Sequence, residues 1–122
     1  MDLIPITSEY YEFVRRLRTH SDNRDGFILQ ADITIQQQLE YMNKYSKNYY
    51  ICLASLAPVG YIGVIDNDIR VCTHPDHKGK GVGKFMLDQI SSIFPDAAGK
   101  IKKDNIASQK LFDKCKVPYT II

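Results

Sequence analysis

The sequence predicts an α/β domain in which a mixed sheet packs against helices. Three observations support this fold class. Strand-like runs follow one another at residues 49–54, 59–65 and 69–74, amphipathic helical patterns flank them, and a glycine-rich loop opens a further helix. The expected order of elements is βααβββαβαβ, with no internal repeat. At 122 residues the chain is long enough for one sizeable core and not for two, so residues 1–122 are expected to form a single domain.

The first third of the chain predicts a short strand and two helices. Residues 3–6 have a strand-like pattern, and Thr7 or Ser8 can cap the helix that follows. Thr34 and Gln37 have the spacing of a capping box, which opens the second helix. Residues 20–32, between the helices, are expected to be irregular. Each helix should bury an apolar stripe: Tyr10, Phe13, Val14 and Leu17 in the first, and Ile35, Leu39 and Met42 in the second.

The remaining elements are predicted by turns and helical spacing. A turn at residues 55–58 joins the first two central runs, and Asp66-Asn67-Asp68 is typical of a tight turn before the third. The helix after the glycine loop ends near Pro95, and a short strand is expected at residues 99–103, before a helix capped at Asp104-Asn105. A last strand follows at residues 117–122. The two helices should bury Val82, Met86, Ile90 and Ile93 in one case, and Ser108, Leu111, Phe112 and Cys115 in the other.

Composition and charge narrow the class of protein. The start of the chain lacks the pattern of a signal peptide, no apolar run approaches the ~20 residues of a membrane span, and three cysteines without CxxC spacing argue against disulfides and zinc. We therefore expect a cytoplasmic protein with no membrane partner and no metal. Nine of the eleven lysines lie from Lys78 onward, which suits a polyanionic ligand. Nucleic acid is not the expected partner, because no finger motif or aromatic-rich basic strand is present.

The glycine-rich stretch HKGKGVGK, residues 77–84, predicts a phosphate site at the start of a helix. It fails the P-loop template G-x-x-x-x-G-K-[ST], which would need glycine at Lys78 and a hydroxyl at Phe85. It also fails the dinucleotide-binding template G-x-G-x-x-G, because Gly79 and Gly81 are followed by Lys84.

The stretch VCTHPDHKGKGVGKFML resembles the [QR]-x-x-G-x-[GA] signature of the GNAT superfamily, the acyl-CoA-dependent N-acyltransferases. Lys78 stands at the Gln/Arg position, and Gly81 and Gly83 stand at the two small positions. The preceding strand with its HP pair and the later DNIASQKLF resemble two other markers of that family, in the right order and spacing. The resemblance implies a GNAT-like fold with a shortened C-terminus and an acetyl-CoA-dependent N-acetyltransferase.

The resemblance also implies which residues bind acetyl-CoA. Backbone groups of Val71, Cys72 and Thr73 would pair with the pantetheine arm as an added strand would, which requires a neighbouring strand that diverges. Asn105 matches an asparagine that hydrogen-bonds the pantetheine, although its position suits a helix N-cap equally well. The pyrophosphate would lie against the glycine loop, formed by Lys78, Gly79, Lys80, Gly81, Val82, Gly83 and Lys84.

Catalysis requires an uncharged amine, so a base must remove a proton from the acceptor. In relatives the base lies near the start of the strand before the glycine loop, where this chain has Asp66 and Asp68. Asp68 is the first candidate, although both aspartates also suit a tight turn. His74 and His77 are the other titratable candidates.

The family's usual proton donor to the departing thiolate is a tyrosine seven residues after the asparagine. Here that position is Phe112, so the proton would come from water, from another group such as Tyr119, or from the product ammonium. Cys115 lies near in sequence but on the apolar face, so it is expected in the core.

The expected acceptor is a primary amine of a small molecule. The first half of the chain resembles, faintly, enzymes that acetylate nucleotide-linked amino sugars, in which case Arg18 and Arg24 are candidates to meet a phosphate. Amino-acid, polyamine and peptide amines remain open, and the alternative function is a non-catalytic acyl-CoA-binding module. An open sheet edge at residues 119–122 predicts a homodimer. The loop residues expected to contact the acceptor are His20, Asp22, Asn23, Arg24, Asp25 and Gln30.

Overall fold

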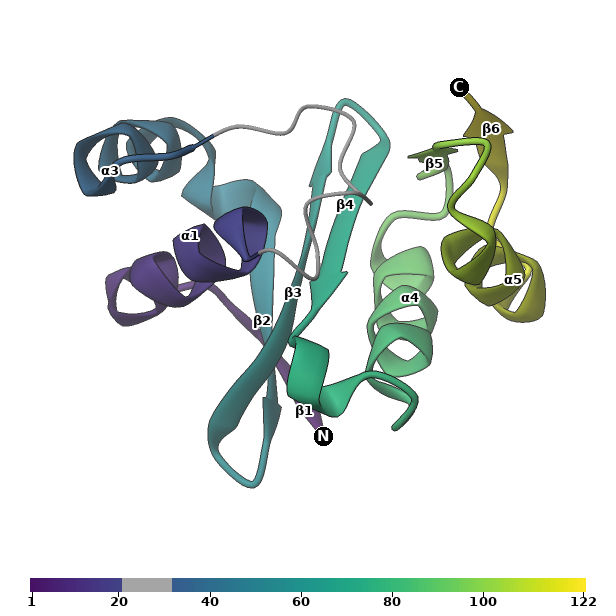
Figure 1. Cartoon of the computed structure of the whole chain (residues 1–122), viewed down its shortest axis with the longest axis horizontal. Coiled ribbons are helices and arrows are strands. Elements are labelled where there is room, and N and C mark those ends of the chain that lie inside the picture. The colour runs from purple at the N-terminus through teal and green to yellow at the C-terminus, as the bar shows by residue number, and fades with distance from the viewer. Residues whose placement is uncertain (21–31) are drawn as a thin grey trace.

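The computed structural model describes residues 1–20 and 32–122, and it confirms the predicted mixed α/β class. A four-stranded antiparallel sheet in the order β1-β2-β3-β4 has α1 and α3 on one side and α4 and α5 on the other (Figure 1). A second, two-stranded sheet pairs β5 and β6 in parallel. The strands are β1 Asp2–Pro5, β2 Tyr49–Ala54, β3 Ala57–Ile65, β4 Asp68–Thr73, β5 Gly99–Ile101 and β6 Tyr119–Ile121. The helices are α1 Tyr11–Thr19, α3 Ile35–Tyr45, α4 Val82–Ile93 and α5 Ile106–Cys115, with 3-10 turns at Ser8–Tyr10, Ser46–Asn48 and Pro75–His77.

Two tight hairpins build the centre of the main sheet. Ser55 and Leu56 join β2 to β3, and Asp66 and Asn67 join β3 to β4, with positive φ at all four residues. Consecutive positive φ angles are the geometry of a type I′ turn, whose twist matches that of the flanking strands. The predicted turn before β4 is therefore confirmed, and β3 starts earlier than predicted because its hairpin loop is only two residues long.

Strands β4 and β5 lie side by side only where they begin. The N–H of Ile69 donates to the carbonyl of Ala98 at 2.9 Å, and the N–H of Ala98 donates to the carbonyl of Asn67 at 2.9 Å. Beyond this parallel bridge β5 pairs with β6, through Gly99 opposite Tyr119, and no longer with β4. One edge of β4 is thus left without a neighbouring strand in the described part of the chain.

Each face of the sheet has its own core. Val82, Met86, Leu87 and Ile90 of α4 pack with Ile62, Val64 and Ile69 on one face, and Val14, Leu17 and Met42 pack with Ile51 and Tyr61 on the other. Phe112 of α5 belongs to the first core, where it is 3% exposed. No helix among the described residues is long and apolar enough to cross a membrane.

Two predicted helical faces and one predicted helix cap need correction. In α3 the capping box of Thr34 and Gln37 is present, but Leu39 is exposed, and Gln38 is buried beside Met42. The buried face is rotated because Gln38 fits between the helices, where its amide donates to the carbonyl of Tyr11 at 3.2 Å. The predicted stripes also fail at two outer residues, since Ile35, at the start of α3, and Ile93, at the end of α4, are exposed. The predicted cap at Thr7 is absent, because the side chain of Thr7 donates to Glu9 instead.

The C-terminal elements are shorter than predicted, and their packing is tight. The last helix fully buries Phe112, while Ser108, Leu111 and Cys115 are half-buried. An ideal Cβ built on Gly99 of β5 would lie 2.5 Å from Cε2 of Phe112. The aromatic ring therefore occupies the space that a side chain at position 99 would need.

This contact predicts the effect of Gly99→Ala on stability. The added methyl group forces the Phe112 ring to shift, so we expect a loss of about 1–3 kcal/mol in the free energy of unfolding, measured in urea. Combining Gly99→Ala with Phe112→Leu should cost less than the sum of the two single changes, since the smaller side chain relieves the clash. An unchanged urea midpoint for Gly99→Ala would contradict the packing described here.

Candidate functional site

Residues 78–81 of the glycine loop connect the 3-10 turn after β4 to the start of α4, and residues 82–84 form the first turn of that helix. Gly79 and Gly81 have φ angles of +78° and +82°, a backbone conformation that residues with a Cβ rarely adopt. An ideal Cβ at either position would meet nothing within 4 Å, so the space above the loop is open. Gly81 is also the N-cap of α4 and offers no side chain to its first N–H groups. The loop and the first turn of α4 thus present backbone N–H groups and the positive end of a helix to an open surface, which favours an anion.

Gly83 has a different role from the other two glycines of the predicted signature. A Cβ there would lie 2.8 Å from Cδ2 of Leu111 in α5. Its small size therefore allows α4 and α5 to approach each other, in addition to any contact with a ligand.

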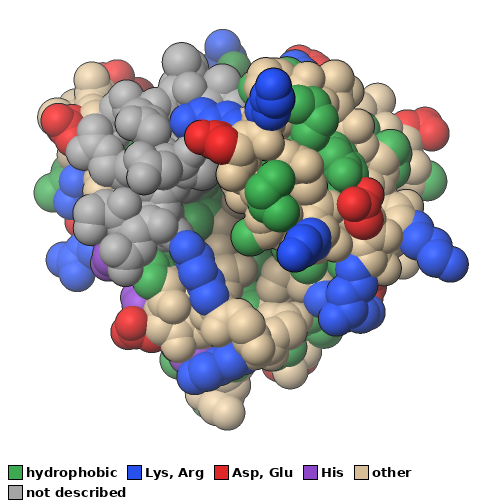
Figure 2. Space-filling view, turned by 45° about the vertical axis from the view of Figure 1, so that its right-hand side comes forward, with side chains coloured by type: hydrophobic (Ala, Val, Ile, Leu, Met, Phe, Trp, Pro, Cys, Tyr) green, Lys and Arg blue, Asp and Glu red, His purple; other side chains and the backbone are tan. Residues whose placement is uncertain are grey.

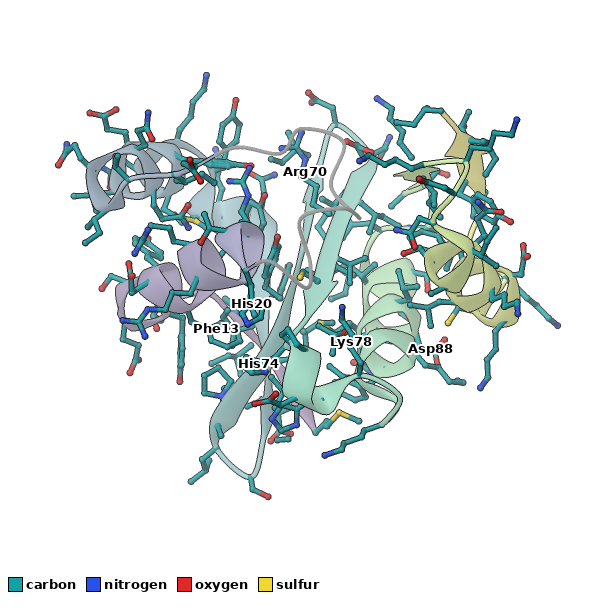
Figure 3. All side chains as sticks on the ribbon, in the orientation of Figure 1. Phe13, His20, Arg70, His74, Lys78 and Asp88 are labelled. Carbon is teal, nitrogen blue, oxygen red and sulfur yellow. The ribbon has the colours of Figure 1, made fainter. Side chains whose placement is uncertain are left out.

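The lysines around the loop are exposed but not equivalent. Lys84 binds Asp88 one turn along α4, with its Nζ 2.5 Å from Oδ2, so part of its charge is already matched. Lys78 lies between β4 and α4 (Figure 3). Burial raises the pKa of the Cys72 thiol to about 12, and the positive charge of Lys78 partly opposes this rise. Figure 2 shows a hollow on this face of the molecule with Lys and Arg side chains around its rim.

The backbone directions along β4 reduce the three predicted pantetheine contacts to two residues. The Ile69 amide points toward β5, and the His74 amide donates to Val59 of β3 at 2.8 Å. Backbone N–H and C=O groups alternate in direction along an antiparallel strand. Those of Val71 and Thr73 therefore point toward the gap between β4 and β5, whereas those of Cys72 point toward β3. Of the three predicted residues, Val71 and Thr73 are therefore the two that can pair with an added extended chain, and the backbone of Cys72 is committed to the sheet.

Asn105 is the N-cap of α5. Its side-chain oxygen accepts a hydrogen bond from the N–H of Ser108 at 3.2 Å. This capping role leaves the side-chain NH₂ group as a donor, so a contact with a ligand stays a prediction for the same residue.

The two candidate bases lie in different surroundings. Asp66 is an exposed residue of the hairpin turn. Asp68 begins β4, its side chain is 23% exposed, and its Oδ2 is 3.8 Å from Nε of Arg70. Partial burial and a fixed neighbour suit Asp68 better than Asp66 to act on a bound molecule.

The histidines lie at the other end of β4. The His74 ring stacks on Phe13 with a centroid separation of 6.3 Å, and its Nδ1 accepts the N–H of Asp76 at 3.1 Å. His20, Phe13, His74 and His77 border one groove between α1 and the turn after β4 (Figure 3). The predicted acceptor residues Asp22, Asn23, Arg24, Asp25 and Gln30 lie outside the described residues.

The residues discussed as proton donors are held in other contacts. Phe112 packs edge-on against Tyr119, with ring centroids 5.9 Å apart, and is part of the core. The Tyr119 hydroxyl donates to Asp113 at 2.9 Å, and this carboxylate raises the pKa of the phenol. Burial likewise raises the pKa of the Cys115 thiol.

A polar cluster on the α1/α3 face was not predicted from the sequence. The hydroxyls of Tyr41 and Tyr49 are 2.7 Å apart, and Nη1 of Arg70 donates to the Tyr41 hydroxyl at 3.0 Å. Burial is the main cause that raises the pKa of Tyr49, well above its ordinary value. The only signal in the sequence was the alternation of side chains along β4, which places the Arg70 side chain on the other face of the sheet from those of Ile69 and Val71.

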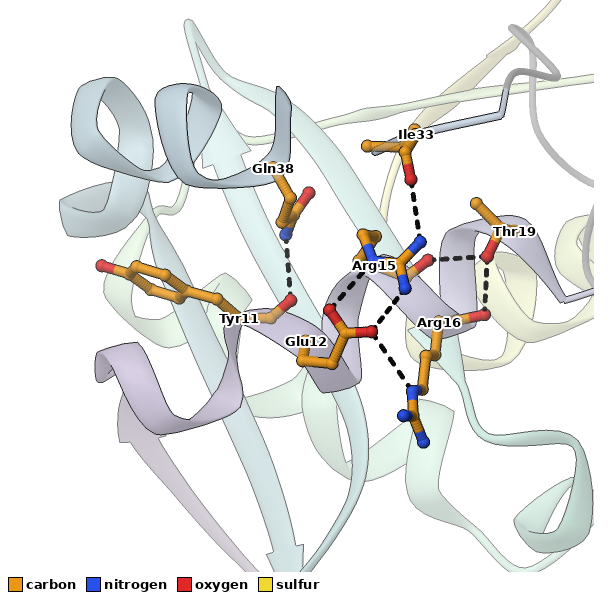
Figure 4. A network of polar contacts seen from close by, with 7 residues as sticks. All are labelled: Tyr11, Glu12, Arg15, Arg16, Thr19, Ile33 and Gln38. Carbon is orange, nitrogen blue, oxygen red and sulfur yellow. Dashed lines mark hydrogen bonds and ion pairs between the residues drawn. The ribbon is translucent and has the colours of Figure 1, made fainter. Parts of the chain in front are cut away.

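The helices that carry this cluster are tied together by a separate network (Figure 4). Arg15 binds Glu12 through two hydrogen bonds of 2.9 and 2.5 Å, and it donates to the carbonyl of Ile33 at 2.9 Å, just before α3. The amide of Gln38 reaches back to Tyr11 in α1. These contacts fix α3 against α1. They therefore help to set the position of Tyr41 over the sheet.

Comparison with known proteins identifies the fold. A sequence model of the acetyltransferase (GNAT) family matches residues 7–116, whereas no curated protein sequence matches the chain. Spermidine N-acetyltransferase from Vibrio cholerae, solved in complex with CoA and spermine, is 13% identical with a TM-score of 0.80, over 93% of this chain and 78% of that one. A domain from Methanocaldococcus jannaschii is 17% identical with a TM-score of 0.81, over 94% and 86%. Ribosomal-protein-alanine N-acetyltransferase from Brucella melitensis is 11% identical with a TM-score of 0.80, over 93% and 82%.

These similarities agree with the resemblance predicted from the glycine loop. At such low identity the solved structures show the shared fold, while the family match covers most of the sequence. The chain therefore belongs to the acetyltransferase (GNAT) family of acetyl-CoA-dependent N-acetyltransferases.

Proposed function

We propose that this chain transfers an acetyl group from acetyl-CoA to a primary amine of a small molecule. The observation that carries the proposal is the open edge of β4, which is followed, after one 3-10 turn, by a glycine loop at an uncapped helix N-terminus. An extended arm that ends in a pyrophosphate matches both parts of this surface.

The residues present fit coenzyme A. Val71 and Thr73 would pair with the amides of its pantetheine arm, and Asn105 would add a side-chain contact. The amides of residues 79–84 would hold the pyrophosphate, in the open space that a Cβ at Gly79 or Gly81 would otherwise enter. Lys78, Lys80 and Lys84 would add positive charge, although Asp88 already matches part of the charge of Lys84.

The proposed chemistry requires one proton to leave the acceptor amine and one proton to reach the departing thiolate. Bound acetyl-CoA supplies an activated acetyl group as a thioester. The chain must orient the acceptor amine and remove its proton, and Asp68 is the proposed base, directly or through a water molecule. Because Phe112 cannot donate a proton and Tyr119 is bonded to Asp113, the proton for the departing thiolate would come from water or from the product ammonium.

The acceptor of this proposed reaction is a primary amine. The proposed acceptor classes are amino sugars, including nucleotide-linked ones, amino acids, polyamines and peptide amines. The Vibrio cholerae protein, which is 13% identical to this chain, was solved with spermine.

We also propose a cytoplasmic homodimer. Its support is the edge strand β6, whose outer residue Ile121 is exposed, and the three free cysteines among the described residues.

A non-catalytic acyl-CoA-binding module is the alternative, favoured by Phe112 at the position of the usual proton donor. Release of free thiol from acetyl-CoA in the presence of an amine panel separates the two. Binding of coenzyme A without thiol release for any amine would favour the module.

Gly81→Asp tests the loop. The substitution places a Cβ in a left-handed conformation and a negative charge where the pyrophosphate would lie, so calorimetry should show loss of coenzyme A binding while the fold persists. Asn67→Asp is a matched control, because it adds the same charge at an exposed turn residue whose φ is also positive, at +63°. Equal affinity of Gly81→Asp and the unaltered protein would refute the assignment.

Asp68→Asn tests the base. If Asp68 removes the proton from the amine, kcat should fall by ~10²–10⁴-fold while the affinity for coenzyme A stays unchanged. Asp66→Asn should have a much smaller effect, because Asp66 is exposed in the turn. A larger loss of kcat for Asp66→Asn than for Asp68→Asn would reverse the assignment.

A further inference from the structure

Arg70 leaves β4 on the face that α1 and α3 cover. Its Nη1 donates to the Tyr41 hydroxyl at 3.0 Å, and its Nε lies 3.8 Å from Oδ2 of Asp68. The side chain is nevertheless 44% exposed. The contact with Tyr41 fixes the direction of the guanidinium, and Nη2 carries two more N–H donors in the same plane.

A second guanidinium lies in the same cluster. Cζ of Arg18, from the last turn of α1, is 5.4 Å from the centre of the Tyr41 ring. The charges of Arg70 and Arg18 both act on the phenol of Tyr49, where they oppose the rise in its pKa that burial causes. Asp68 is the one carboxylate that contacts this cluster in the described part of the chain. Counted over residues 1–20 and 32–122, two cations and one anion give the cluster a net positive charge.

We propose that the acceptor amine carries an oxyanion group, a carboxylate or a phosphate, and that Arg70 binds this group as a specificity-determining residue. The inference rests on the proposed function, because it places the acceptor on the α1/α3 face. Arg70 directly precedes Val71, whose backbone faces the gap proposed for the pantetheine, so an acceptor held by Arg70 lies beside the acetyl donor. A planar guanidinium with two adjacent donors matches the geometry of carboxylate and phosphate oxygens.

The same charges disfavour a polyamine. Among the described residues a polycation would approach two guanidinium groups with a single carboxylate to offset them, and like charges repel most strongly where water is partly excluded. An acceptor with its own oxyanion instead neutralises Arg70. Cationic surroundings also favour the uncharged form of a nearby amine, which is the form that attacks a thioester.

The test compares matched acceptors that differ only in the anionic group. The probes are D-glucosamine 6-phosphate against D-glucosamine, L-phenylalanine against L-phenylalaninamide, and spermidine. Each is tested for binding to the full chain saturated with coenzyme A, by calorimetry, and for thiol release from acetyl-CoA. The two pairs distinguish phosphate from carboxylate as the source of the oxyanion. The variants are Arg70→Gln and Tyr41→Phe, with Arg16→Gln as the control, because the Arg16 side chain is 77% exposed on α1 and binds Glu12.

We expect the anionic member of at least one pair to bind about tenfold more tightly than its neutral partner, as a charged hydrogen bond allows. Arg70→Gln should abolish this preference in the binding affinities, Tyr41→Phe should weaken it, and Arg16→Gln should preserve it. Equal affinities within both pairs, failure of every probe to bind, or tightest binding of spermidine would overturn the inference. Failure of the proposed function is recognised separately, by the absence of coenzyme A binding.

Discussion

The separation of β4 from β5 controls the rest of this structure. The two strands share hydrogen bonds only at Ile69 and Ala98, after which β5 turns to pair with β6. β4 is the last strand of the four-stranded sheet, and among the described residues no strand pairs with its outer side beyond the bridge at Ala98, so backbone groups there lack strand partners. Because the chain then leaves β4 through the glycine loop, the open edge and the start of α4 form one continuous surface.

The two cores support this opening from both faces. On one face α4 packs against β3 and β4, and the lack of a side chain at Gly83 lets α5 approach α4. On the other face α1 and α3 hold the tyrosine–arginine cluster against β2 and β4. A surface suited to an extended anionic ligand and a surface suited to a second, smaller molecule therefore adjoin at β4. A direct transfer between two substrates requires that the two molecules meet in this way.

Local sequence signals predicted most of the fold. The capping box at Thr34, the turn at Asp66 and Asn67, and the glycine loop each depend on a few adjacent residues, and all three are present in the structure. The errors arose where a residue's surroundings come from distant segments. Gln38 replaced Leu39 on the buried face because its partner, Tyr11, belongs to another helix. The bond between Arg70 and Tyr41 joins residues 29 positions apart, so no pattern along the chain could indicate it.

The central claim is that an extended ligand completes the open edge of β4, and amide hydrogen exchange tests it residue by residue. In the free protein the amides of Val71 and Thr73 should exchange faster than those of Arg70 and Cys72, which the alternation in β4 places toward β3. Saturation with coenzyme A should slow exchange at Val71 and Thr73 and change Arg70 and Cys72 little. Unchanged exchange at Val71 and Thr73 in the presence of bound coenzyme A would contradict the account.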